Sequence, residues 1–250
     1  MLKQTLLPAE WSPHAGTLLT WPHRYSDWRP LLDEVDETYT VLASQIGNFE
    51  TVVIACYDAV HRNHVQTLLA DKLPPERMRL YIAPSNDTWA RDYGPITVYC
   101  DGRPLMLDFR FNGWGGKFSY ELDDRVCQLL SAAGAFGAAP VKSVPLILEG
   151  GSIESDGQGT LLSTRQCLLS PTRNNMSRAE LESRLAPLLG IRRFLWLDDG
   201  FLMGDDTDGH IDTLARFCDS ETIAYQSCDN PADEHFRPLR AMEAQLRHFR

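Results

Sequence analysis

The fold class is decided by the stretch Ile96-Thr97-Val98-Tyr99-Cys100-Asp101-Gly102-Arg103-Pro104-Leu105-Met106-Leu107-Asp108-Phe109. Two runs rich in apolar residues, Ile96–Cys100 and Leu105–Phe109, flank the dipeptide Asp101-Gly102. Asp-Gly between two such runs is a strong hairpin signal, because both residues tolerate the positive φ of a tight turn. The sequence therefore predicts a β-hairpin over residues 96–109.

Helices and strands surround this hairpin in a recurring order. Two further hairpins are expected, at Leu146–Ser152 with Thr160–Ser163 and at His210–Phe217 with Thr222–Gln226. Helices are predicted over residues 31–46, 58–72, 122–133, 177–189 and 231–249, and further strands over residues 52–55, 78–83 and 193–197. The order of helix, strand and hairpin recurs about three times, which indicates a repeated α/β architecture whose units bury their faces against one another.

No linker or low-complexity stretch divides the chain, so one domain over residues 1–250 is expected. The last predicted helix is not followed by a strand and a hairpin. The sequence therefore also predicts that the last unit of the repeat is unfinished.

Composition narrows the class of protein. The chain has 250 residues, a formal net charge of -10 and a pI near 5.1, which disfavours a nucleic-acid partner and mildly suits a cationic small molecule. No apolar run approaches the roughly 18 residues of a membrane span, and the N-terminal residues lack the pattern of a secretory signal. A cytoplasmic enzyme without a membrane partner is expected. The six cysteines form no CxxC pair, so neither a zinc site nor a disulfide framework is predicted, and buried inert thiols are the simplest interpretation.

Two loops combine aromatic and charged residues. The segment Asn86–Pro95 contains Trp89, Arg91 and Asp92 just before a predicted strand. It is either part of a site or a loop pinned by an Asp–Arg pair. In the segment Phe111–Lys117, Trp114 stands among glycines, where it would lie over a cationic ligand or fill the core of a tight loop.

Two further clusters carry groups for proton transfer and cation binding. Glu149 closes an apolar run and precedes Gly150-Gly151, which let a ligand or another backbone come close. A hairpin bulge with a solvated glutamate is the alternative. His210 and Asp212 stand two apart in a predicted strand, so the carboxylate would raise the pKa of the imidazole on the same face. A divalent-metal site and a solvated acidic turn remain open for this cluster.

These motifs together resemble the agmatine deiminase and Porphyromonas-type peptidylarginine deiminase family. The resemblance is collinear from about Trp11 onward and includes the N-terminal segments Thr20–His23 and Asp27-Trp28. Its longer motifs are Asn86–Pro95, Phe111–Gly115, Leu148–Ser152, Cys167–Asn174 and Gly204–Asp212.

The resemblance implies a pseudo-fivefold α/β propeller around a central site, with no metal and no organic cofactor. It implies that Asp92 and Asp212 grip a guanidinium, that His210 transfers protons and that Glu149 is a third carboxylate. Trp89 and Trp114 would line the substrate pocket. The implied substrate is a small cationic guanidine such as agmatine, converted to a carbamoyl product and ammonia in polyamine metabolism; a homo-oligomer is possible.

One feature of the family is missing. The family's nucleophilic cysteine lies in a C-terminal Gly-rich motif, with a histidine shortly before it, and this sequence contains no such motif. We therefore expect a C-terminally truncated, inactive chain. The alternatives are a guanidine-binding protein without catalysis, an arginine or peptidylarginine deiminase, and a metal-dependent hydrolase using Glu149, Asp206, His210 and Asp212.

Overall fold

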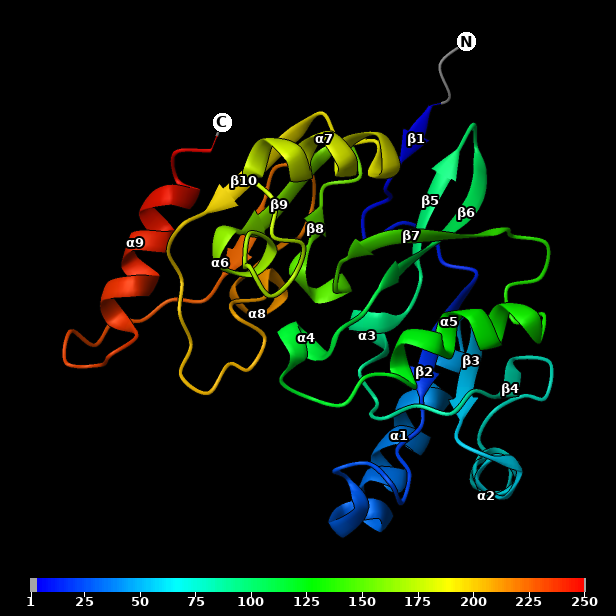
Figure 1. Cartoon of the computed structure of the whole chain (residues 1–250). Coiled ribbons are helices and arrows are strands. Elements are labelled where there is room, and N and C mark those ends of the chain that lie inside the picture. Colours follow the sequence, from blue (N-terminus) through cyan, green and yellow to red (C-terminus); the bar gives the residue numbers. More distant parts are fainter. Residues whose placement is uncertain (1–3, 250) are drawn as a thin grey trace.

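The computed structural model describes residues 4–249 and shows a mixed α/β fold with four sheets (Figure 1). The first unit is a parallel sheet in the order β2-β3-β4, whose strands are linked by helices that cover it. Its core includes the fully buried Trp21. The elements are β2 (Gly16–Thr20), η1 (Arg29–Leu31), α1 (Leu32–Gly47), β3 (Thr51–Cys56), α2 (Ala59–Leu69) and β4 (Met78–Ile82).

The second unit contains the predicted hairpin. Strands β5 (Ile96–Cys100) and β6 (Arg103–Arg110) pair antiparallel around Asp101-Gly102, and both turn residues have positive φ, as the sequence predicts. The sheet has the order β1-β5-β6-β7. Its other elements are β1 (Thr5–Leu6), α3 (Ala90–Tyr93), α4 (Gly113–Gly116), α5 (Asp123–Ala132) and β7 (Val141–Ile147).

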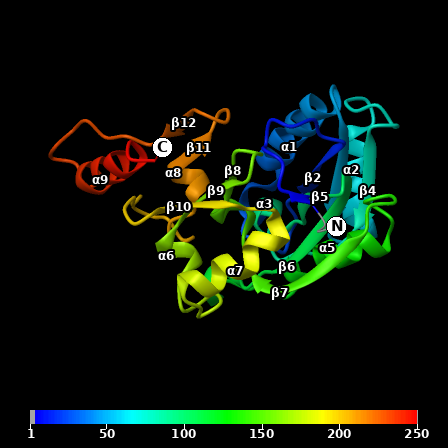
Figure 2. The same cartoon turned by 90° about the horizontal axis from the view of Figure 1, so that it is seen from above.

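The third and fourth units follow at the other end of the molecule. In both views α9 lies opposite α1 and α2 (Figures 1 and 2). The third unit comprises η2 (Gly150–Ser152), β8 (Glu154–Ser155), β9 (Thr160–Thr164), α6 (Arg165–Leu168), α7 (Arg178–Leu189) and β10 (Arg193–Leu197). The fourth comprises α8 (Ile211–Leu214), β11 (Ala215–Phe217), β12 (Ile223–Tyr225) and α9 (Phe236–Leu246).

Helix α7 begins and ends as its sequence predicts. The Ser177 side chain accepts a hydrogen bond from the backbone N–H of Glu180, and the Glu180 carboxylate accepts one from the backbone N–H of Ser177. Gly190 ends the helix in the left-handed conformation. Helix α9 is shorter than predicted, because residues 231–235 form turns before it starts.

Two predicted strand pairings are wrong in part. Leu146–Ser152 does not pair with Thr160–Ser163: β7 pairs in parallel with β6, and the short β8 forms the hairpin with β9. The segment from His210 does not continue as one strand, because Ile211–Leu214 forms a helical turn before β11 begins. In so short a segment, the spacing of apolar residues does not distinguish a strand from one turn of helix.

The repeated units are present, and the fivefold propeller arrangement stays a prediction. Within residues 4–249, no helix has both the length and the apolar character needed to cross a bilayer.

Candidate active site

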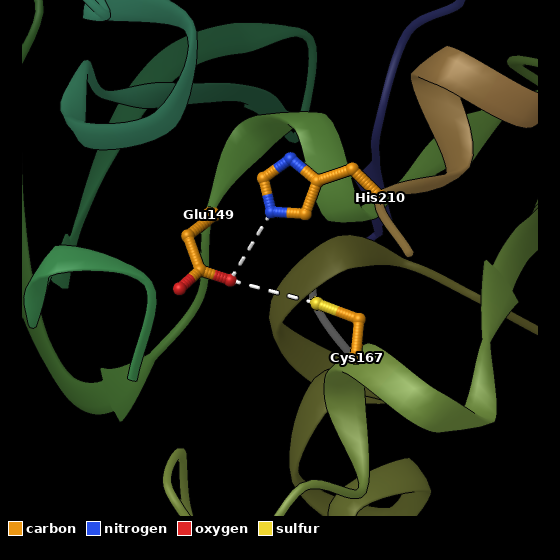
Figure 3. A group of neighbouring side chains, drawn as sticks. All are labelled: Glu149, Cys167 and His210. Carbon is orange, nitrogen blue, oxygen red and sulfur yellow. Dashed lines mark hydrogen bonds and ion pairs between the residues drawn. The ribbon is translucent and has the colours of Figure 1, made fainter. Parts of the chain in front are cut away.

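His210 lies at the centre of a buried polar cluster. It precedes α8, and its Nε2 is 3.4 Å from Glu149 Oε2. The same carboxylate oxygen accepts from the Cys167 thiol, at 3.7 Å, so it lies between the imidazole and the sulfur (Figure 3). Glu149 is fully buried, which excludes the interpretation of a solvated bulge glutamate.

Asp92 approaches the other nitrogen of the same imidazole. Its Oδ1 lies 3.6 Å from His210 Nδ1 and accepts from the backbone N–H of Gly151 at 2.9 Å. Its Oδ2 accepts from Trp114 Nε1 at 3.0 Å. Trp114 is buried in the tight turn of α4 with φ of 55°, edge-on to Phe111, so its indole is a fixed donor rather than a free lid. Asp92 is thus oriented by two donors from different segments.

Gly151 marks the point where these side chains meet. A Cβ at this position would lie 2.5 Å from His210 Nδ1, 2.7 Å from Asp212 Oδ2 and 2.8 Å from Asp92 Oδ1. Any side chain at position 151 would therefore occupy the centre of the cluster. The structure thus brings together all four catalytic candidates of the sequence, from α3, the segment before η2, and the start of α8.

Arg173 is a site residue that the motif reasoning did not single out. Its side chain is fully buried and donates from Nε to both Glu149 oxygens, at 3.0 and 3.4 Å. A buried carboxylate costs several kcal/mol unless it is paired, and Arg173 supplies the pairing charge. The signal was available in the motif Cys167–Asn174, but the pairing spans 24 residues and is not visible in any local pattern.

The electrostatics suit proton transfer at His210. Burial alone would lower the pKa of its imidazole, but the Glu149 hydrogen bond and the charges of Asp92, Glu149 and Asp212 outweigh burial and raise that pKa. Burial also raises the pKa of Asp212, and the Asp92 charge adds to this, against the opposing effect of His210. The Cys167 thiol differs: burial and the Glu149 charge hold its pKa well above the ordinary value.

Glu149, Cys167 and His210 are the described residues grouped closely enough to share a metal ion. Arg173 already occupies both oxygens of Glu149, and the thiol would have to lose its proton from a buried position. The four residues of the metal-hydrolase alternative are not gathered in that group. Asp206 is exposed and lines the rim of a neighbouring pocket instead.

That pocket has a volume of about 410 Å³ and opens beside Asp92. Trp89, 48% exposed, forms part of its wall, and its indole N–H donates to Asp87 at 3.0 Å. Aromatic rings and carboxylates dominate the lining, which suits a cationic ligand. The lining residues are Asp27, Trp28, Leu31, Asp87, Trp89, Asp92, Trp114, Phe118, Asp206 and Thr207.

Comparisons with known proteins identify the family of the chain. The sequence model of the Porphyromonas-type peptidyl-arginine deiminase family matches residues 6–250. A candidate agmatine deiminase from Shewanella baltica is 34% identical over 237 residues, which cover 92% of this chain and 61% of the relative. The chain thus spans about 61% of the length of the curated relatives it matches.

Solved structures show the same fold. An agmatine deiminase from C. jejuni, a cysteine-to-serine variant with substrate bound, superposes with a TM-score of 0.91 at 36% identity, covering 98% of this chain and 71% of that one. A candidate arginine deiminase from Porphyromonas gingivalis superposes with a TM-score of 0.90 at 43% identity, covering 99% and 73%. The chain therefore belongs to the Porphyromonas-type peptidyl-arginine deiminase family, which includes the agmatine deiminases.

Proposed function

We propose that this chain forms the guanidinium-binding and proton-transfer part of a deiminase that hydrolyses agmatine, or a related small guanidine, to a carbamoyl product and ammonia. The observation that carries the proposal is the meeting of Asp92, Glu149 and Asp212 around His210. A guanidinium is a planar cation with forked donors, which carboxylates match in pairs.

Each residue has a proposed role. Asp92 and Asp212 grip the guanidinium and turn its carbon toward a nucleophile, while Glu149 completes the negative surroundings. A thiolate adds to that carbon, and His210 gives its proton to the nitrogen that leaves as ammonia. His210 then takes a proton from water, which attacks the same carbon and releases the thiolate.

The nucleophile is the group that the described residues do not supply. Cys167 is the cysteine that reaches the cluster, but it is buried, donates to Glu149 and has a pKa raised well above its ordinary value. A thiol in such surroundings is inert, since the thiolate is the reactive form. We infer that the reaction needs a cysteine other than these six, and that the 250-residue chain alone binds substrate without turning it over.

The lining of the pocket favours a second positive charge. Asp27, Asp87 and Asp206 lie along the lining, beside Trp28 and Trp89. Agmatine presents an ammonium at the end of its chain, whereas arginine presents a carboxylate next to its amine, which these carboxylates repel. We therefore propose agmatine as the preferred substrate over arginine.

Calorimetric titration of the 250-residue chain with agmatine and with arginine tests the proposal, together with an ammonia assay. Micromolar binding of agmatine is expected, with weaker binding of arginine and no ammonia released. Asp92→Asn should remove binding of both ligands, while Asp206→Asn should narrow the preference for agmatine. Turnover by the purified chain, or equal affinity for both ligands, would contradict the corresponding part of the proposal.

A further inference from the structure

Arg173 makes contacts in two directions at once. On one side its Nε donates to the Glu149 carboxylate. On the other side Nη1 donates to the Asp208 carboxylate, and Nη2 donates to the backbone oxygen of Thr207 at 3.0 Å. The guanidinium thus has a protein acceptor for each of its three nitrogens.

The second set of contacts lies in the segment that carries His210. Asp208 is two residues before His210, has a φ of 67° and is also bound by Lys117 Nζ at 2.6 Å. The His210 backbone N–H donates to Thr207 Oγ1 at 3.1 Å. Arg173 therefore joins Glu149, one partner of the imidazole, to the loop from which the imidazole projects.

The geometry points to Arg173 as a positioning residue: by binding Glu149 and the Thr207–Asp208 loop together, it holds the Glu149 carboxylate against His210 Nε2. This inference rests on the proposed guanidine-binding function. Each nitrogen of the Arg173 guanidinium already donates to Glu149, Asp208 or Thr207, so Arg173 acts through these residues and His210 rather than on the substrate.

The charged groups around His210 also indicate that Arg173 is a positioning residue. Asp92, Glu149, Asp212 and the Cys167 thiol face His210 from the packed elements, and Arg173 is the cation bound to Glu149. Without it, the buried Glu149 would take up a proton or turn away, because an unpaired buried carboxylate is costly. His210 would then lose the hydrogen bond that favours its charged form.

The test compares Arg173→Met and Arg173→Lys with Arg165→Met, a control in α6 whose arginine forms an exposed ion pair with Asp198. The titration of the His210 imidazole is followed by NMR in the ligand-free chain and assigned with His210→Gln. Agmatine binding is measured by calorimetry and folding by circular dichroism. The His210 titration needs no ligand, so it stays informative if wild-type chain fails to bind agmatine, a result that would refute only the proposed function.

We expect Arg173→Met to lower the pKa of His210 and to weaken agmatine binding by roughly tenfold or more, the usual size for groups that orient a site's direct ligands. Arg173→Lys keeps the charge, but one ammonium cannot span Glu149 and the loop, so both effects should be intermediate. Arg165→Met should match the wild type.

A pKa of His210 that rises in Arg173→Met would overturn the inference, because simple removal of a nearby cation has that effect. If Arg173→Met does not fold, Arg173→Lys decides. If the His210 pKa and the agmatine affinity of Arg173→Lys equal those of the wild type, the forked guanidinium of Arg173 is not needed to position Glu149 against His210.

Discussion

Replacing Gly151 with alanine should disable the site while leaving the fold intact. The added methyl would lie 2.5, 2.7 and 2.8 Å from polar atoms of His210, Asp212 and Asp92. To reach the 3.4 Å of ordinary van der Waals contact, these atoms would have to retreat by about 0.9, 0.7 and 0.6 Å. The two carboxylates proposed to hold the guanidinium and the imidazole proposed to transfer protons would therefore all move outward.

The size of the effect follows from those displacements. Overpacking a buried position costs about 1–3 kcal/mol of stability, which a domain of ordinary stability withstands. Misplacement of a site by about 1 Å costs on the order of a hundredfold in function. We expect Gly151→Ala to melt a few degrees lower and to bind agmatine at least tenfold more weakly. A small loss of stability together with a large loss of affinity would indicate that the substitution acts on the site rather than on the fold.

The assay is calorimetric titration with agmatine, alongside thermal unfolding. Gly134→Ala is the matched control, because its added methyl meets no atom within 4 Å but its φ of +78° penalises a side chain. That variant should lose about 1 kcal/mol of stability and keep its affinity. Wild-type affinity in Gly151→Ala would refute the convergence of the three side chains on this glycine.

Further predictions concern single contacts of the site. Trp114→Phe removes the indole donor to Asp92, a hydrogen bond to a charged group that contributes about 1.5–3 kcal/mol to stability, so the melting temperature should fall by several degrees. Agmatine affinity should fall about tenfold, because Asp92 loses one of the two donors that orient it. Agmatine affinity should also fall as the pH drops through the raised pKa of Asp212, because the protonated carboxyl no longer attracts the guanidinium. Calorimetry in two buffers would detect protons released on binding, and their absence would contradict this assignment. Under native conditions iodoacetamide should modify the exposed Cys218 and spare Cys167, as read by peptide mass spectrometry, and rapid alkylation of Cys167 would contradict its raised pKa.

Local signals predicted the elements whose boundaries depend on local chemistry. The Asp101-Gly102 turn and the capping box of Ser177 lie where the sequence places them, because each stabilises its element through neighbouring backbone groups. The partner of β7 was not predictable in this way. Strand pairing is decided by packing across the whole unit, and β7 joins β6 in parallel after a helix of intervening chain.

The site also combines features that local sequence indicates with contacts that depend on long-range packing. The motifs that resemble the family indicated Asp92, Glu149, His210 and Asp212. The structure gathers Asp92, His210 and Asp212 around Gly151 and places Glu149 against His210. The contacts that orient them could not be read from the sequence, since Arg173 is separated from Glu149 by 24 residues and from Asp208 by 35.

Because the side chains of the site meet at Gly151, ligand binding reports whether the units of the chain have folded together. Its side chains come from segments separated by tens of residues, so no single unit contains a binding-competent fragment of it. Non-local contacts of this kind form late, after the cost of closing the intervening loops has been met. Asp27 and Trp28 of the first unit also line the pocket, so agmatine should bind only molecules in which all four units have docked. Its bound fraction should therefore follow the global unfolding transition rather than the melting of any one sheet.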